Sequence, residues 1–309
     1  MSLLLAFILL IIGLILLTKG ADYFIENSAS FAEDKGISPH VVGVTIVAFG
    51  TSLPELLVSI ISSFQGYNDL ALGNIVGSNI SNIGLVLASS SFVFYYILGT
   101  DIQPNADSNN DSYVMFSAVF LLIIFAQDNV INSTEGLVFF ILYIIYLVSL
   151  FFRTKNKEGR INEEDHTSYV FLVSGLVAML FGAQLTVDSA VEVATHLGVS
   201  QIVIGLSVVA IGTSLPELAG TLSAARMGHK EIAVGNVIGS NIANIFMVMG
   251  VLAMINDVAV EQWILDTTLP LLMILTLATF GLIRVPLHRL SGYILLAFFV
   301  LFMYELTFV

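Results

Sequence analysis

The sequence predicts an all-α polytopic membrane protein, because it is strongly apolar and its apolar residues come in long runs. Of 309 residues, 57% are hydrophobic and 11% are charged, and the mean hydropathy is +0.95, which no ordinary soluble domain reaches. The apolar runs are about 20 residues or longer, which suits helices that cross about 30 Å of hydrocarbon. The alternating pattern of a membrane β-barrel is absent.

Ten transmembrane helices are expected, in two groups of five. The first group spans 3–28, 38–64, 70–98, 113–127 and 135–153. The second group spans 168–194, 200–226, 231–255, 266–284 and 288–308. We expect helices 2, 3, 7 and 8 to be broken, near 51–54, 77–79, 213–216 and 239–241. The segment Met1 to Leu17 has no basic residue before Lys19, so we interpret it as part of the first helix and not as a signal peptide.

The two groups repeat each other. The motif Gly-Thr-Ser-Leu-Pro-Glu occupies 50–55 and 212–217, and Gly-Asn-x-x-Gly-Ser-Asn occupies 73–79 and 235–241. Both pairs are offset by 162 residues, the difference between positions 217 and 55, with no gap from Gly20/Gly182 to Ile83/Ile245. We therefore divide the chain into a first repeat (1–153), a polar linker (154–167) and a second repeat (168–309).

The positions of the basic residues predict the orientation of the helices. All loop-associated Lys and Arg residues lie in odd-numbered connections: Lys35, Arg153, Lys155, Lys157, Arg160, Arg226, Lys230, Arg284 and Arg289. The positive-inside rule places these connections, including the linker, in the cytoplasm and both termini outside. With five helices per repeat, the second repeat starts on the opposite side from the first, so the repeats are expected to be inverted.

Each repeat carries a glutamate inside an apolar run, directly after a proline. A carboxylate in hydrocarbon is costly, so Glu55 and Glu217 are functional candidates. Pro54 cannot donate a hydrogen bond to the carbonyl of Gly50, and Pro216 has the same effect in the second repeat, so each proline should loosen the preceding turn and free its carbonyls. Helical spacing allows the Thr, Ser and Glu of each motif to share one face.

The resulting side chains offer only oxygen, because no His or Cys lies near the motifs. Oxygen ligands suit hard cations; Ca²⁺ takes six to eight of them, and two carboxylates balance its charge. Hydroxyls and carbonyls suit Na⁺, and the absence of nitrogen and sulfur argues against zinc, copper or iron. One cation site built from two inverted halves is typical of alternating-access transporters.

Other polar residues have simpler interpretations. Ser59 and Thr221 are expected to bond back to their own helices. Glu26 and Asp188 are interpreted as residues of the membrane interface. The same interpretation covers all five histidines, which fall at helix ends or loops: His40, His166, His196, His229 and His288.

The duplicated motifs resemble the α-repeats of the sodium/calcium exchanger family, of the prokaryotic type, within the cation/calcium antiporter superfamily. The resemblance covers nearly the whole chain and implies exchange of Na⁺ against Ca²⁺ by alternating access in a prokaryotic plasma membrane. It implies that Glu55 and Glu217 bind Ca²⁺ and share Na⁺. The other implied cation-site residues are Ala48 and Ala210 through their carbonyls, and Thr51, Thr213, Ser52, Ser214, Ser78, Ser240, Asn82 and Asn244.

Two positions bear on the driving ion. Potassium-dependent relatives carry Asp where this chain has Asn244, which lowers the expectation of K⁺ cotransport. Proton/calcium exchangers typically have Glu at the positions of Gly77 and Gly239, so sodium is favoured over protons, and a proton-driven Ca²⁺ antiporter is the alternative. An enzyme is not expected, since Ser52 and Ser214 have no His or Lys at helical spacing. The expected partners are the two ions and the lipid bilayer, with no cofactor and no nucleic acid; monomer and homo-oligomer both stay open.

Overall fold

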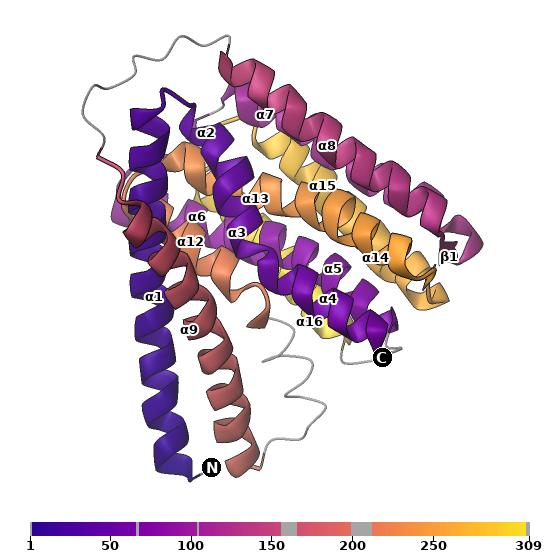
Figure 1. Cartoon of the computed structure of the whole chain (residues 1–309), viewed down its shortest axis with the longest axis horizontal. Helices are drawn as coiled ribbons and strands as arrows, with labels where there is room; N and C mark the ends of the chain where they lie inside the picture. The colour runs from indigo at the N-terminus through magenta and orange to yellow at the C-terminus, as the bar shows by residue number, and fades with distance from the viewer. Residues whose placement is uncertain (1, 66–67, 104, 156–165, 199–211, 307–309) are drawn as a thin grey trace.

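The computed structural model of the chain describes residues 2–65, 68–103, 105–155, 166–198 and 212–306 (Figure 1). Within these ranges, seven helices are long and apolar enough to cross a membrane, and a bent pair, 39–51 with 53–64, makes an eighth if it is counted as one span. The chain is therefore an all-helical, multi-pass membrane protein.

The second expected helix is broken where its proline predicts. It consists of α2 (Pro39–Val42), the π-helical η1 (Gly43–Val47), α3 (Ala48–Thr51) and α4 (Leu53–Phe64). The axis bends by 41° at Ser52, the residue between α3 and α4. Pro54 is the second residue of α4, where a missing N–H removes no bond that α4 needs. The expected break near 51–54 is confirmed.

The expected breaks in helices 3 and 8 are wrong. α5 (Asn68–Ser81) and α13 (Lys230–Ile242) continue through 77–79 and 239–241. Gly77 and Gly239 weaken a helix but keep their N–H donors, so the hydrogen-bond ladder continues as it could not through a proline. The backbone instead widens into π-helix at η2 (Asn82–Leu87) and η6 (Ala243–Met249). π-Helical turns are rare and frequently occur at functional sites.

The other elements follow the expected order with shifted ends. The two long spans are completed by α6 (Ala88–Phe92) with η3 (Val93–Ile97), and by α14 (Gly250–Ile255). The outer helices are α1 (Leu3–Asp34), α7 (Ala106–Phe125), α8 (Ser133–Lys155), α9 (Tyr169–His196), η7 (Ile264–Thr268) with α15 (Leu269–Leu282), and α16 (Arg289–Glu305). Short segments η4 (Ala126–Asp128), β1 (Val130–Ile131) and β2 (Val258–Ala259) join α7 to α8 and α14 to η7, and the two strands pair antiparallel. Of the expected seventh helix, α12 (Leu215–Arg226) and Gly212 are described, whereas 200–211 lie outside the described residues.

The motif-bearing helices form the centre of the molecule. In the span Lys230–Ile255, 83% of the most apolar stretch is buried, against 22% in α1. Side chains of α1 such as Ile11 and Ile15 are more than half exposed. In a membrane protein such a surface faces lipid, so α1 lies outside and α13–α14 inside.

α1 and α9 form an antiparallel pair at one side of the bundle (Figure 1). Gly13 of α1 packs against Gly182 of α9, and Gly20 packs against Gly175. The residue numbers therefore increase along α1 in the direction in which they decrease along α9, which makes the pair antiparallel. A Cβ atom at Gly13 would lie 2.8 Å from the backbone nitrogen of Thr186, and one at Gly175 would lie 2.7 Å from that of Phe24. Only glycine permits this approach.

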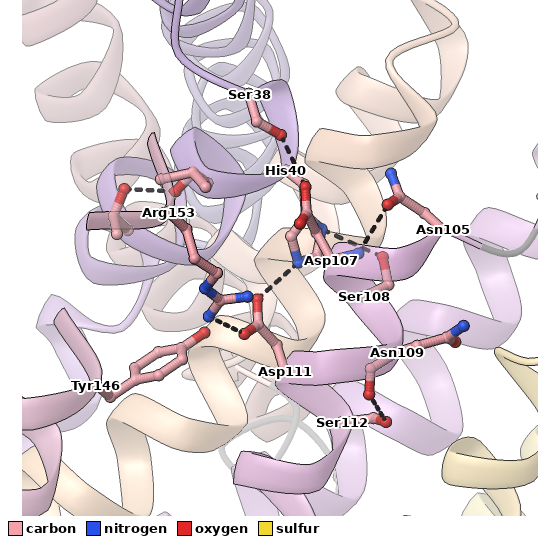
Figure 2. Close-up of polar contacts among 12 residues, drawn as sticks. Ser38, His40, Asn105, Asp107, Ser108, Asn109, Asp111, Ser112, Tyr146 and Arg153 are labelled. Atoms are coloured by element: carbon pink, nitrogen blue, oxygen red, sulfur yellow. Dashed lines mark hydrogen bonds and ion pairs between the residues drawn. The ribbon is translucent and has the colours of Figure 1, made fainter. Parts of the chain in front are cut away.

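A buried ion network joins α2, α7 and α8 (Figure 2). Asp111 Oδ2 lies 2.9 Å from His40 Nε2, and Asp111 Oδ1 accepts a 2.5 Å bond from Arg153 Nη2. His40 and Asp111 have no exposed side-chain surface. His40 is therefore a buried, paired residue and not the interfacial one expected.

α7 begins at Ala106 and not at 113. Its first turns are polar, but Asn105 caps them and their side chains find partners inside the protein.

Candidate functional site

Both glutamates lie at the start of a helix, directly after a proline. Glu55 and Glu217 are the third residues of α4 and α12, and both are completely buried. The N-terminal turn of a helix carries partial positive charge and favours a carboxylate. The break thus gives each buried carboxylate a favourable electrostatic position that a continuous helix would not provide.

Hydroxyl groups link the carboxylates across the two halves of the chain. Ser52 Oγ donates to Glu217 Oε1 at 3.0 Å, and Ser78 Oγ donates to Glu55 Oε1 at 3.4 Å. Ser78 Oγ also lies 3.5 Å from Thr213 Oγ1. Five of the expected site residues therefore form two hydrogen-bonded groups, Ser52 with Glu217 and Ser78 with Glu55 and Thr213, and each group joins the two halves of the chain.

Each carboxylate keeps one oxygen available. Oε2 of Glu55 and Oε2 of Glu217 are buried without a hydrogen-bond partner in the described part of the chain, as is Oγ of Ser214. Buried polar atoms are nearly always paired, so such atoms require an explanation. These three oxygens are of the type that a hard cation binds.

Thr51 connects the first repeat to α13 of the second repeat, because two of its neighbours, Asn236 and Ser240, lie on α13. Its Oγ1 donates to Asn236 Oδ1 at 3.1 Å, lies 3.4 Å from Ser240 Oγ and is 3.3 Å from the carbonyl of Ala48. That carbonyl also accepts the N–H of Ser52 at 3.0 Å. Pro54 thus removes the bond to the Gly50 carbonyl, four residues earlier, while the Ala48 carbonyl keeps its bond within the helix. Ala48 can still offer its second lone pair.

The remaining expected residues are less closely connected to the carboxylates. Asn244 Nδ2 donates to Asn79 Oδ1 at 3.3 Å, and both amide atoms of Asn82 are buried without partners among the described residues. Within the same ranges, neither Asn82 nor Asn244 bonds to Glu55 or Glu217. Ala210 lies outside the described residues.

Two asparagines next to the carboxylates are absent from the expected site. Asn74 Nδ2 donates to the Glu55 carbonyl at 3.4 Å and to Ser59 Oγ at 3.1 Å. Asn236 repeats this arrangement on the backbone of Glu217 and the side chain of Thr221. Ser59 and Thr221 thus accept bonds from a neighbouring helix, contrary to the back-bonding expected of them. The signal was available, since the Gly-Asn pairs recur at the repeat offset.

A cleft of about 400 Å³ reaches this region from the side of α9. Its lining includes Pro54, Pro216 and Thr213 from the broken helices, with Gln184 and Asp188 from α9. Gln184 Nε2 donates to Asp188 Oδ1 at 2.8 Å. Asp188, interpreted from sequence as interfacial, therefore lies on a cleft that reaches Pro54 and Pro216.

The two glutamates and the hydroxyls near them offer oxygen atoms, which are the ligands that hard cations take. Two carboxylates provide two negative charges that balance one Ca²⁺ or neutralise more than one Na⁺. Among the described residues there is no group of three or more His, Cys, Asp or Glu that could hold a metal ion. The oxygen atoms described at the centre belong to two carboxylates and several hydroxyls, and such ligands suit a hard cation better than a transition metal.

Comparisons with known proteins agree with this chemistry. A family sequence model described as "Sodium/calcium exchanger protein" matches residues 5–152 and 167–308. Sodium/calcium exchanger MaX1 of Methanosarcina acetivorans is 32% identical, with 98% of this chain and 99% of the relative covered. Putative antiporter CaxA of Alkalimonas amylolytica is 34% identical with the same coverage.

Solved structures agree as well. A structure of the sodium-calcium exchanger NCX_Mj, soaked with 2.5 mM Na⁺ and 0.1 mM Ca²⁺, has a TM-score of 0.86 to this chain at 34% identity, and the match covers 97% of this chain and 98% of that one. The sequence match and the fold match both extend over almost the full length. The chain belongs to the sodium/calcium exchanger family.

Proposed function

We propose that Glu55 and Glu217 form the centre at which this Na⁺/Ca²⁺ antiporter binds its two ions alternately. The observation that carries the proposal is the Ser52–Glu217 hydrogen bond, which joins the two motifs at one buried point. Each carboxylate there has an oxygen without a partner among the described residues. Thr51, Ser78, Thr213, Ser214 and Ser240 would supply further oxygens, with the carbonyls of Ala48 and Ala210 and the amides of Asn82 and Asn244.

Occupancy would control whether the centre can change its exposure. Two uncompensated carboxylates in a low-dielectric interior carry a large desolvation penalty. One Ca²⁺ or more than one Na⁺ neutralises them. The empty, doubly charged centre would therefore resist rearrangement, and this couples the movement of one ion to the return of the other.

The proposed architecture is ten helices in two inverted repeats, and the contacts between the two halves of the chain support it. The described contacts recur under exchange of the halves: Gly13–Gly182 corresponds to Gly175–Gly20, and Thr51–Ser240 corresponds to Thr213–Ser78. An antiparallel α1–α9 pair supports inversion, because equivalent helices of inverted repeats run in opposite directions. In this arrangement 1–153 and 168–309 are the repeats, 154–167 is the cytoplasmic linker, and both termini face the outside of a prokaryotic plasma membrane.

Movement of α1 and α9 would open the centre to one side at a time. The cleft between α9 and the proline breaks supports this, since its lining includes Thr213 as well as α9 residues. The glycine contacts keep α1 and α9 together as one unit. That unit would slide against the broken helices, which the ion network and the central packing hold in place.

Ion gradients imposed one at a time test the proposal. Purified protein in proteoliposomes should take up Ca²⁺ when the lumen holds more Na⁺ than the medium. A K⁺ gradient or a pH gradient alone should drive no uptake. Uptake driven by the pH gradient and not by Na⁺ would support the proton-driven alternative, and uptake with no gradient of a counter-ion would indicate a channel.

A further inference from the structure

Asn236 is buried between the two halves of the centre and uses both ends of its amide. Its Nδ2 donates to the Glu217 carbonyl at 3.4 Å and to Thr221 Oγ1 at 2.8 Å. Its Oδ1 accepts a 3.1 Å bond from Thr51 Oγ1, which belongs to the first repeat. The side chain has no exposed surface.

The chemistry of these neighbours determines which way the amide faces. A backbone carbonyl can only accept, so the Glu217 carbonyl requires the NH₂ end of Asn236. The reversed amide would set two acceptors against each other. Oδ1 must therefore point away from α12, toward Thr51.

This orientation decides where Thr51 directs its proton. A hydroxyl has one hydrogen and two lone pairs, and it can bind a cation only through a lone pair. Asn236 Oδ1 is the nearest acceptor of the Thr51 hydrogen, at 3.1 Å, against 3.3 Å for the Ala48 carbonyl and 3.4 Å for Ser240 Oγ. With its hydrogen on Asn236, Thr51 Oγ1 keeps its lone pairs for the centre.

The equivalent asparagine of the first repeat lacks this connection. Asn74 holds the Glu55 carbonyl and Ser59 as Asn236 holds Glu217 and Thr221. Thr213, the equivalent of Thr51, lies 3.5 Å from Ser78, and in the described ranges it makes no bond to Asn74. Asn74 is half-buried whereas Asn236 is completely buried, but Asn74 makes the same pair of bonds without a link to the motif threonine, so it serves as the control for the Thr51 connection.

We propose that Asn236 is a positioning residue for ion binding: it takes the Thr51 proton and so orients the Thr51 lone pairs toward the cation. The proposal rests on the proposed function of the Glu55–Glu217 centre. Asn236 would act only through Thr51, so its contribution should vanish when the Thr51 hydroxyl is absent.

A double-mutant cycle tests this dependence. Asn236→Leu, Thr51→Val and the double variant of the full chain are reconstituted in proteoliposomes, and the KM for Ca²⁺ and the maximal rate of Na⁺-driven uptake are measured. Each single change should raise the KM about tenfold, the scale of one lost hydrogen bond. The double variant should raise it no further than the larger single change. Thr51→Ser, which keeps the hydroxyl, should restore a KM near that of the unaltered protein.

The control cycle uses Asn74→Leu with Thr51→Val, whose effects on KM should multiply. Multiplying effects for Asn236 and Thr51 would overturn the proposal. Thermal unfolding checks that each variant folds, and Asn236→Ala replaces Asn236→Leu in the same cycle if the leucine is not accommodated. Glu55→Gln and Glu217→Gln are measured alongside. If both variants retain exchange, the proposed ion-binding centre is wrong, and the proposal for Asn236 is wrong with it. If both lose exchange while the effects of the Asn236 and Thr51 changes on KM multiply, only the positioning role of Asn236 is refuted.

Discussion

Ser52 donates a 3.0 Å hydrogen bond to Oε1 of Glu217, although 165 positions separate the two residues in the chain. Ser52 lies at the bend between α3 and α4, three residues before Glu55. The break that positions one carboxylate therefore also turns a hydroxyl toward the other. The equivalent hydroxyl, Ser214 Oγ, has no partner among the described residues. The two motifs are identical in sequence and differ in their bonding.

This difference predicts unequal effects of two equivalent substitutions. Ser52→Ala removes a bond to a buried carboxylate and should destabilise the ion-free protein by about 1.5–3 kcal/mol. Ser214→Ala removes no described bond and should have a smaller effect. Thermal unfolding in detergent without Ca²⁺ measures both, and equal destabilisation by the two variants would contradict the asymmetry.

Ca²⁺ should stabilise the protein through the same centre. A ligand that binds only the folded state adds about 2.7 kcal/mol at one hundred times its dissociation constant. The unfolding midpoint should therefore rise with Ca²⁺ and fall again with a chelator. Glu217→Gln should remove most of this rise, because it removes one of the two balancing charges. An equal rise in the variant would place the stabilising ion elsewhere.

The ion network should be essential for stability. Arg153→Met leaves Asp111 buried without its guanidinium partner, and removing one member of a buried ion pair costs about 3–5 kcal/mol. The Arg153 side chain is 27% exposed, so we expect a loss near the lower end of this range. Asp111→Leu combined with Arg153→Met should recover part of the loss, since no unpaired charge is left buried. If the unfolding midpoint falls as far in the double variant as in Arg153→Met alone, the explanation by an unpaired buried charge is contradicted.

The glycines between α1 and α9 should not tolerate a methyl group. A Cβ atom at Gly20 would overlap the backbone of Met179, so Gly20→Ala should destabilise the protein by about 1–3 kcal/mol through overpacking. Gly281 of α15 is exposed, and its Cβ position has no described neighbour within 4 Å, which makes Gly281→Ala the control. Urea or thermal unfolding compares the two; equal stability of both variants would show that the seam can adjust.

Much of this centre could be predicted from the sequence because prolines and repeats have direct structural consequences. The proline in each motif predicted a break, and in the first repeat the structure shows it at Ser52, with Glu55 buried three residues later. The breaks expected at Gly77 and Gly239 were wrong because glycine keeps its N–H. The π-helical turns that follow have no clear signal in residue type.

Long-range partners could not be predicted from local pattern. The polar stretch before 113 was expected to be a loop, but Asp111 is helical and buried because His40 and Arg153 reach it from other helices. The role of Asn236 likewise depends on Thr51, which only the fold brings within 3.1 Å. Repetition of the Gly-Asn pair marked the position without indicating its partner.

The most direct test of the account is Ca²⁺ uptake into Na⁺-loaded proteoliposomes by Glu55→Gln and Glu217→Gln, with Glu261→Gln, an exposed carboxylate beside β2, as the control. We predict that both buried variants lose Na⁺-driven uptake to the level of protein-free vesicles, while the control retains it. Uptake by either buried variant at the rate of the unaltered protein would contradict a shared two-carboxylate centre.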